Sequence, residues 1–304
     1  MPSDVPVIDL MMGLPEGHKK DWYAFMRKGF MDAESSEMEF PAQYMFKDVP
    51  KDIDENVDPV GAVLAEMDHF NIEKAMLGIG GRADVDRGNV SRALKDHPDR
   101  FFCSYEVDPN RGMEGVRDLV RAYETHGIKA ATAFPAGMLP QVPINDKKFY
   151  PLYAKCIELD IPITLTTGVP GPRVPMLCQK TELLDEVCWF FPELKIITRH
   201  GGEPWSELMV KLLLKWPNLH YSTSAFAPKH YNKDIIHFAN TRGADKVMYC
   251  GYFPAGLTLE RQFRDMPNVP FKDDVWPKFL RENALRVFKI PEAIEKATGK
   301  PFGS

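Results

Sequence analysis

The segments IKAATAF (residues 128–134), ITLTT (163–167) and KIITRH (195–200) are three short, mostly apolar runs that decide how this chain folds. Runs of this length, bounded by Gly, Pro or Asp, are typical of buried parallel strands. Between the first two runs, residues 147–159 carry apolar side chains at a spacing near 3.6, which is typical of an amphipathic helix. These segments predict a strand–helix unit that repeats along the chain.

The same alternation continues toward both ends of the chain. Further strand-like runs lie at 5–10, 74–79, 101–107, 219–224 and 246–251. Two more helix-like stretches are 113–126, which Gly127 closes, and 204–216, which opens with a proline. Eight strands alternating with helices predict an α/β fold, a parallel sheet closed as a (β/α)₈ TIM barrel, with an open doubly wound sheet as the alternative. Because such a barrel takes about 250 residues, residues 1–304 are expected to form one domain.

One segment interrupts the alternation. Residues 12–57 separate the first strand from its helix and are rich in Met, Phe, Tyr and Trp. An insertion after the first strand emerges at the carboxyl ends of the strands, where barrels bind ligands. We therefore expect an apolar cap over the mouth of the barrel, and the alternative is a strap that only packs on it.

The composition excludes several classes of protein. The net charge of −5, from 38 basic and 43 acidic residues, argues against nucleic acid or an anionic membrane as the main partner. No apolar run approaches the ~18 residues of a membrane span, and the first residues lack the features of a signal peptide. The five cysteines form no C-x-x-C pair, so neither a zinc ribbon nor a disulfide framework is indicated. We expect a cytoplasmic protein that acts on a small molecule.

The stretch LKIITRHGGEPW at 194–205 resembles the H-G-G-x-P-W signature of the amidohydrolase-related family, which includes aminocarboxymuconate-semialdehyde decarboxylase and the resorcylate decarboxylases. Other segments resemble the family's landmarks in the same order: GIKA (127–130), PLY (151–153), IPI (161–163), TTG (166–168), YCGYFP (249–254) and NALR (283–286). The resemblance covers nearly the whole chain outside 12–57. It implies a barrel, a hydrolase or lyase activity, and a homodimer.

The sequence departs from the family at its metal ligands. Relatives usually bind one divalent metal through an H-x-H on the first strand, a His on the fifth and an Asp on the eighth. Here Met11 and Gly13 stand at the H-x-H, Thr166 at the fifth-strand His and Tyr252 at the Asp. Thioether and hydroxyl groups are poor ligands for zinc or manganese. The resemblance therefore implies a member without metal or other cofactor, and a relocated metal site stays as an alternative.

One family residue with a role in proton transfer is retained. His200 matches the sixth-strand His of the family, and a His with a pKa near neutrality can act as acid and base without metal. The alternative is a histidine that hydrogen-bonds a neighbouring loop.

Two further candidates depend on the alignment with the family. Tyr252 would face His200 across the mouth, where its phenol could donate to an oxyanion, or act as a general acid if its pKa were lowered. Its alternative role is to fill the vacated metal site. Asp9 could be a general base or an orienting group, or simply a buried carboxylate paired with a Lys or Arg.

Substrate-binding residues are expected at the same mouth: Met11, Met12, Trp22, Phe25 and Thr166. Arg82 and Arg173 follow predicted strands and could clamp a carboxylate or phosphate. Arg199 directly precedes His200, so strand alternation predicts that the two side chains point in opposite directions and that Arg199 is structural.

Three functions remain open. The first is metal-independent hydrolysis of a fairly apolar acid, ester or thioester, and the second is decarboxylation or another C–C cleavage. The third is a catalytically silent binding protein or partner subunit. The pattern G-x-G-x-x-A at 78–83 also matches a dinucleotide-binding loop, but a glycine-rich loop after a barrel strand is its commoner explanation.

Overall fold

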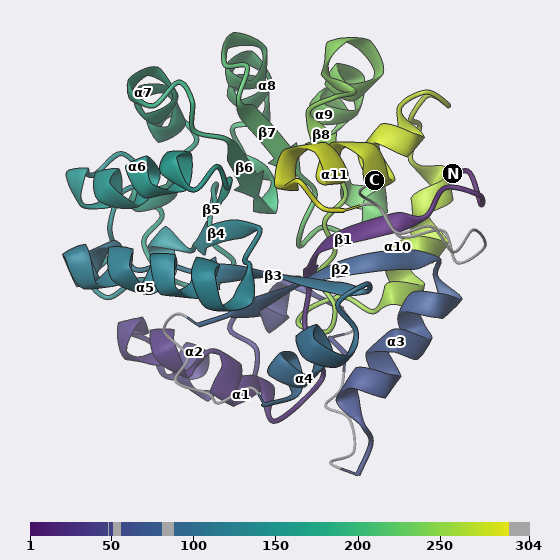
Figure 1. Cartoon of the computed structure of the whole chain (residues 1–304), viewed down its shortest axis with the longest axis horizontal. Helices are drawn as coiled ribbons and strands as arrows, with labels where there is room; N and C mark the ends of the chain where they lie inside the picture. The colour runs from purple at the N-terminus through teal and green to yellow at the C-terminus, as the bar shows by residue number, and fades with distance from the viewer. Residues whose placement is uncertain (48, 51–55, 81–87, 292–304) are drawn as a thin grey trace.

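The computed structural model describes residues 1–47, 49–50, 56–80 and 88–291. Eight parallel strands form one sheet and follow each other in chain order (Figure 1). They are β1 (Val7–Met12), β2 (Ile72–Ile79), β3 (Phe101–Glu106), β4 (Ala130–Ala133), β5 (Ile163–Thr166), β6 (Ile196–Arg199), β7 (Leu219–Ser222) and β8 (Val247–Met248). The predicted (β/α)₈ TIM barrel is confirmed, because sequential order in a parallel sheet is the order of a barrel and not of a doubly wound sheet.

Helices lie outside the strands and cover them (Figure 1). The α-helices are α1 (Lys19–Trp22), α2 (Ala33–Glu37), α3 (Pro59–His69), α4 (Gly88–Asp96), α5 (Gly112–His126), α6 (Tyr150–Glu158), α7 (Leu183–Phe190), α8 (Ser206–Lys215), α9 (Lys233–Phe238), α10 (Leu259–Asp265) and α11 (Asn283–Phe288). Shorter 3₁₀ and π turns are η1 (Ala24–Gly29), η2 (Gln43–Met45), η3 (Pro109–Arg111), η4 (Pro135–Gly137), η5 (Lys147–Phe149), η6 (Leu177–Gln179), η7 (His200–Gly202), η8 (Pro228–His230), η9 (Ala239–Gly243), η10 (Met266–Asn268) and η11 (Lys278–Glu282). The predicted helix at 113–126 is α5, and Gly127 ends it in a left-handed conformation with φ of 60°.

The interior of the barrel is a separate apolar cluster. It contains strand residues such as Ile8, Met76 and Ile197. The last helix, α11, adds Val287 and Phe288 to this cluster. The interior is therefore filled by side chains, as in other barrels of eight strands, and α11 contributes to its filling.

The first and eighth strands are joined by polar contacts at their carboxyl ends. Asp9 Oδ1 accepts hydrogen bonds from the backbone N–H of Gly251 (2.8 Å) and of Met11 (2.9 Å). The backbone N–H of Gly13 donates to the carbonyl oxygen of Phe253 at 2.9 Å. A side chain at 251 would collide with the Asp9 carboxylate, so glycine is needed for this close approach.

The connection between β1 and α3 contains α1, η1, α2 and η2 and contacts the loop after β5. Arg173 in that loop forms ion pairs with Asp32 (3.3 Å) and Glu34 (2.7 Å). The hydroxyl of Tyr44 donates to the carbonyl oxygen of Gly171 at 2.5 Å. These contacts hold the β1–α3 connection against the carboxyl end of the barrel.

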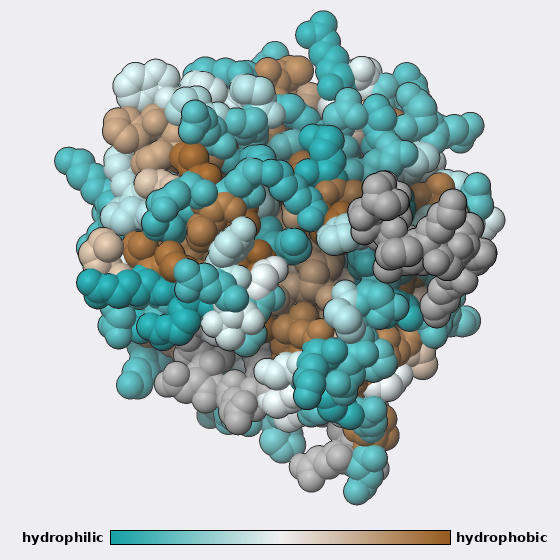
Figure 2. All heavy atoms as spheres, viewed as in Figure 1, coloured by the Kyte–Doolittle hydropathy of each residue, from teal (hydrophilic) through white to brown (hydrophobic). Residues whose placement is uncertain are grey.

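The face of the molecule in Figure 2 is mostly hydrophilic, with apolar side chains visible between the charged ones. In the described part of the chain, no helix has the length and apolar character needed to cross a membrane.

Candidate active site

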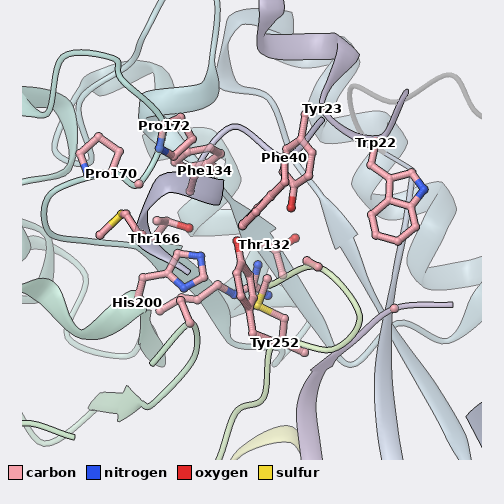
Figure 3. Close-up of a pocket in the computed structure, with 18 of the residues that line it drawn as sticks. Trp22, Tyr23, Phe40, Thr132, Phe134, Thr166, Pro170, Pro172, His200 and Tyr252 are labelled. Carbon is pink, nitrogen blue, oxygen red and sulfur yellow. The ribbon is translucent and has the colours of Figure 1, made fainter. Parts of the chain in front are cut away.

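A cavity of about 300 Å³ lies at the carboxyl ends of the strands. Strand ends contribute Met12, Glu106, Thr132, Thr166 and Arg199 to its walls. The β1–α3 connection supplies Trp22, Tyr23, Phe25, Phe40, Ala42, Met45 and Phe46. In Figure 3, Tyr23 and Phe40 face His200, Thr166 and Tyr252 across this space. The volume is at the low end of the range for small-molecule sites, about 300–1,000 Å³.

A second compartment of about 180 Å³ adjoins the first. The two share the wall residues Met11, Met12, Trp22, Phe25, Glu106, Thr132 and Arg199. The smaller compartment also reaches Ser104 on β3 and Gly78 and Gly80 at the end of β2. The glycine-rich pattern at 78–83 thus begins at this wall, and its residues 81–83 lie outside the described part of the chain.

His200 enters the cavity from a turn that directly follows β6. His200, Gly201 and Gly202 have φ angles of 63°, 77° and 65°, a left-handed run that is costly for a non-glycine residue. A Cβ at Gly202 would lie 2.6 Å from Met209 Cε and 2.9 Å from Thr181 Oγ1. The two glycines of the H-G-G sequence therefore allow the chain to turn tightly and present the imidazole.

The imidazole of His200 is held by Ser224. The His200 backbone N–H donates to Ser224 Oγ at 2.9 Å, and the same oxygen lies 2.9 Å from His200 Nδ1. Burial, together with the charge of Arg199, lowers the pKa of His200 to about 3. This pKa is lower than the value near neutrality that suits an acid–base histidine, because protein surrounds the ring and a guanidinium is its neighbour. The imidazole is neutral at physiological pH.

Tyr252 meets His200 as the alignment predicts. The two ring centroids are 5.4 Å apart at an interplanar angle of 77°. The Tyr252 ring also stacks on Phe46 with centroids 5.8 Å apart. Burial raises the pKa of Tyr252 to about 12, against the smaller opposing effects of a hydrogen bond with Tyr23 and the charge of Arg199. The condition for a general acid, a lowered pKa, is therefore not met, and the phenol is a neutral hydrogen-bond donor.

Arg199 lines both compartments, so the expectation that it points away from His200 was wrong. Strand alternation applies only while the backbone stays extended. β6 ends at Arg199, and the positive φ of His200 turns the chain so that both side chains face the same space. The Arg199 Nε atom is buried and has no hydrogen-bond partner within the described residues.

Asp9 is fully buried and is not one of the residues that line the cavity. Its carboxylate is bound by the backbone N–H groups of Met11 and Gly251, not by a Lys or Arg as in the alternative interpretation. Burial raises the pKa of Asp9 to about 6, opposed by those two hydrogen bonds. Asp9 therefore connects β1 to the segment after β8.

The expected binding residues fall into three groups. Met11, Met12, Trp22, Phe25 and Thr166 all line the cavity. Arg173 lies outside it, because its guanidinium pairs with Asp32 and Glu34 and packs over the Tyr44 ring at 4.9 Å. Arg82 lies outside the described residues.

Sequence reasoning missed Glu106 and Thr132 as wall residues. Their positions at the carboxyl ends of predicted strands were the available signal. Phe40 and Phe46 were noted only as part of an apolar segment, and nothing in their spacing showed which aromatic residues would reach the cavity.

The family model described as Amidohydrolase matches residues 13–290. The chain belongs to the amidohydrolase family. Among curated proteins, none matches the chain.

Three solved structures resemble this chain along nearly its full length. An uncharacterized TIM-barrel protein from Bordetella bronchiseptica has 22% identity, a TM-score of 0.72, and coverage of 94% of this chain and 99% of its own. A 5-carboxyvanillate decarboxylase from Novosphingobium aromaticivorans with bound manganese has 19% identity, a TM-score of 0.67, and coverage of 94% and 98%. A probable 2-pyrone-4,6-dicarboxylic acid hydrolase from Acinetobacter baumannii has 14% identity, a TM-score of 0.60, and coverage of 93% and 99%. At these identities the likeness shows the fold.

Manganese, which the Novosphingobium structure contains, prefers carboxylate, carbonyl and water ligands. Among the described wall residues of the cavity, Glu106 carries a carboxylate and His200 an imidazole. Met11, Thr166 and Tyr252 offer a thioether and two hydroxyls, and the Arg199 guanidinium brings a positive charge to the same walls. Within the described ranges, no group of three or more His, Cys, Asp or Glu side chains is placed to hold a metal ion.

Proposed function

We propose that this amidohydrolase-family protein is an enzyme that hydrolyses the ester or thioester bond of a small, fairly apolar molecule without a bound metal. The observation that carries the proposal is the pairing of His200 and Tyr252, with ring centroids 5.4 Å apart, at the wall of a largely aromatic cavity. Both side chains are neutral at physiological pH, since burial lowers the pKa of the first and raises that of the second. Hydrolysis needs both groups in these forms.

Each residue has a defined part in the proposed reaction. In the tautomer with its hydrogen on Nδ1, which donates to Ser224 Oγ, His200 leaves Nε2 to accept a proton from water as the water oxygen attacks the carbonyl carbon. The Tyr252 hydroxyl donates a hydrogen bond to the carbonyl oxygen, where negative charge develops. The C–O or C–S bond then breaks, and the leaving group takes the proton from His200. The products are a carboxylic acid and an alcohol or thiol.

The walls indicate what kind of molecule enters. Aromatic and Met side chains dominate them, and Met adapts to substrates of different shape. We assign residues 12–57 the role of a cap, because Trp22, Phe40 and Phe46 from this segment form part of the cavity wall. An open cavity that includes His200 and Tyr252 favours catalysis over a silent binding role.

Decarboxylation is the second candidate, and the decarboxylases among the similar structures favour it. That reaction must deliver a proton to the carbon that loses CO₂. With pKa values of about 3 and about 12, His200 and Tyr252 are poor donors of that proton near neutral pH. This argues for hydrolysis as the first assignment.

The test is turnover of a panel of phenyl esters, 4-nitrophenyl esters and phenyl thioesters by protein purified without immobilised nickel. Metal content is measured on the same sample by elemental mass spectrometry. We expect hydrolysis at less than about 0.1 metal ion per chain, and a loss of about 10²-fold or more in His200→Ala. The matched control is His230→Ala, an exposed histidine of η8 that is not part of the cavity.

Three results would contradict the proposal in different ways. Activity that disappears on chelation and returns with manganese or zinc would make the protein a metalloenzyme. Release of CO₂ from aromatic acids, with no ester turnover, would make it a decarboxylase. A His200→Ala variant within a few-fold of wild type would remove His200 from the chemistry.

A further inference from the structure

Gly78 is a glycine that the backbone of β2 does not require. Its φ angle lies outside the left-handed region, and a Cβ added to it would meet no atom within 4 Å. The other described glycines of the two compartments are Gly13, Gly80 and Gly171, and each has a neighbour at 3.0 Å or less from such a Cβ. Glycine weakens the interior of a strand, and it often marks a place where a ligand approaches closely.

Gly78 faces the smaller compartment. It lines the space of about 180 Å³ and is not part of the wall of the larger one. Met76, two residues earlier, belongs to the apolar cluster inside the barrel, and strand residues two apart point to the same face. The lack of a side chain at position 78 therefore widens the compartment on its β2 side.

Two hydroxyl groups from neighbouring strands line the same compartment. Ser104 on β3 pairs with Gly78 in the sheet, and Thr132 lies on β4. Only 2% of Ser104 and 6% of Thr132 is exposed. Neither hydroxyl makes a hydrogen bond with any described residue. Because a hydroxyl both donates and accepts, the two groups are available to an oxygen atom of a ligand.

We propose that the smaller compartment binds a short, uncharged arm of the substrate that carries a hydroxyl or carbonyl oxygen, and that Gly78 limits the size of this arm. This inference rests on the proposed function and adds the substrate class. The bond to be broken and the apolar part of the substrate lie in the larger compartment, beside His200 and Tyr252. The substrate is thus an ester or thioester with one apolar part and one short polar arm.

The size and the charges of the smaller compartment suit such an arm. Its volume of about 180 Å³ is below the range of about 300–1,000 Å³ for whole ligands, so it holds part of a molecule. Glu106 and Arg199 both line it and carry opposite charges. An anionic arm is repelled by the first and a cationic arm by the second, whereas a neutral oxygen is repelled by neither.

The experiment uses amides, which have the shape of the ester but resist hydrolysis, so that binding is measured without turnover. Calorimetric titration compares N-(2-hydroxyethyl)benzamide with N-propylbenzamide, in which a methyl group replaces the hydroxyl. The reversed amides 3-hydroxy-N-phenylpropanamide and N-phenylbutanamide place the arm on the other side of the carbonyl. In at least one pair we expect the hydroxylated member to bind about threefold to tenfold more tightly, as for a neutral hydrogen bond. We expect N-benzoylglycine, whose arm ends in a carboxylate, to bind more weakly than the hydroxylated amide.

Variants place the arm in the smaller compartment. Gly78→Val adds a β-branched side chain to the open space and should weaken binding of the preferred hydroxylated amide by about tenfold. Benzamide, which has no arm, should lose less than about twofold. Ser104→Ala and Thr132→Val should reduce the preference for hydroxyl over methyl. The matched control is Ser91→Ala, an exposed serine of α4, which should keep that preference.

The melting temperature shows whether Gly78 serves the ligand or the fold. Gly78→Ala should not lower it, because alanine is more favourable than glycine inside a strand. Gly80→Ala should lower it, because Gly80 has a φ of 65° and an added Cβ would collide with Tyr105. An equal loss in the two variants would show that the fold requires Gly78 and would overturn its role as a size limit.

The outcomes separate this inference from the proposed function. Equal binding of the two members in both pairs, or tighter binding of N-benzoylglycine, would overturn the uncharged polar arm. A preference for the hydroxylated amide that Gly78→Val abolishes, without hydrolysis of any ester, would support the compartment and overturn the hydrolase assignment. Ester hydrolysis with equal binding in both pairs would do the reverse. Because the pairs are compared on wild-type protein, the test holds even if a variant does not fold.

Discussion

The hydroxyl of Ser224 contacts His200 at two points, accepting a hydrogen bond from its backbone N–H and lying 2.9 Å from its Nδ1 atom. Ser224 is fully buried and stands two residues after β7, next to the strand that leads to His200. One side chain thus fixes both the unusual backbone of His200 and the orientation of its ring.

Replacing Ser224 with Ala is expected to lower kcat by about tenfold with little change in KM, because the ring loses its orienting partner. Steady-state kinetics on an ester substrate gives both parameters. Ser91→Ala, an exposed serine of α4, serves as the control. An equal loss in the two variants, or a change confined to KM, would mean that Ser224 does not orient His200.

Removing only the hydroxyl of Tyr252 separates chemistry from packing. Tyr252→Phe keeps the ring contacts with Phe40 and Phe46. We expect kcat to fall by about 10²–10³-fold, as when one oxyanion donor is lost, and the free energy of unfolding to change by about 1 kcal/mol. Kinetics and urea unfolding on the same sample measure the two quantities. A variant with near-normal kcat would leave Tyr252 as a packing residue only.

The sixth-strand turn is expected to tolerate no side chain at its second glycine. Gly202 has a φ of 65°, and an added Cβ would meet Met209 and Thr181 closely, whereas Gly17 has a φ of 64° with nothing within 4 Å. Gly17→Ala should cost about 1–2 kcal/mol from backbone conformation alone. Gly202→Ala should cost more and also reduce activity by displacing His200. Equal losses in the free energy of unfolding for the two variants would show that Met209 and Thr181 can move away from an added Cβ at no cost.

Buried His220 is expected to make the protein sensitive to acid. This residue of β7 has an Nδ1 atom without a partner within the described residues, and burial lowers its pKa to about 3. Because the unfolded chain binds the proton more readily, His220 makes stability fall as the pH drops from about 6.5 toward 3. Between about pH 7.5 and pH 5, this amounts to about 2 kcal/mol.

His220→Leu removes that titration, so the variant should lose about 2 kcal/mol less than wild type over the same pH interval. Asp9 acts in the opposite direction, since its raised pKa favours the folded state as the pH falls through about 6. Its contribution is common to both proteins and cancels in the difference. Urea unfolding at several pH values gives the comparison, and His230→Ala should follow the wild-type profile. If the free energy of unfolding of His220→Leu and of wild type changed equally with pH, His220 would not be the cause of the acid sensitivity.

Most of the fold could be predicted from the sequence. Each of the eight predicted strands overlaps an observed one, from Val7–Met12 to Val247–Met248. Short apolar runs and helical periodicity are local properties, and eight alternating units leave few other ways to bury both faces of a parallel sheet. The boundaries differ by a few residues because apolar character continues into the connecting turns. The turn after β6 was not predicted, although its two glycines take the positive φ angles that glycine allows.

The arrangement of the site depended on tertiary structure. Arg199 and His200 share one cavity because the chain turns at His200, and a left-handed conformation at a histidine is imposed by its surroundings, not by its own preference. The sequence allowed Arg173 to be a ligand-binding residue, but in the fold its guanidinium pairs with Asp32 and Glu34. The Asp9 carboxylate accepts hydrogen bonds from the backbone N–H groups of Met11 and of Gly251, and Gly251 is 242 residues away in the sequence. The periodicity of the sequence determines which face of each strand or helix is buried, because periodicity is a local property of the chain. Ion pairs and cavity walls are formed by residues that are far apart in the sequence, so only the tertiary structure decides them.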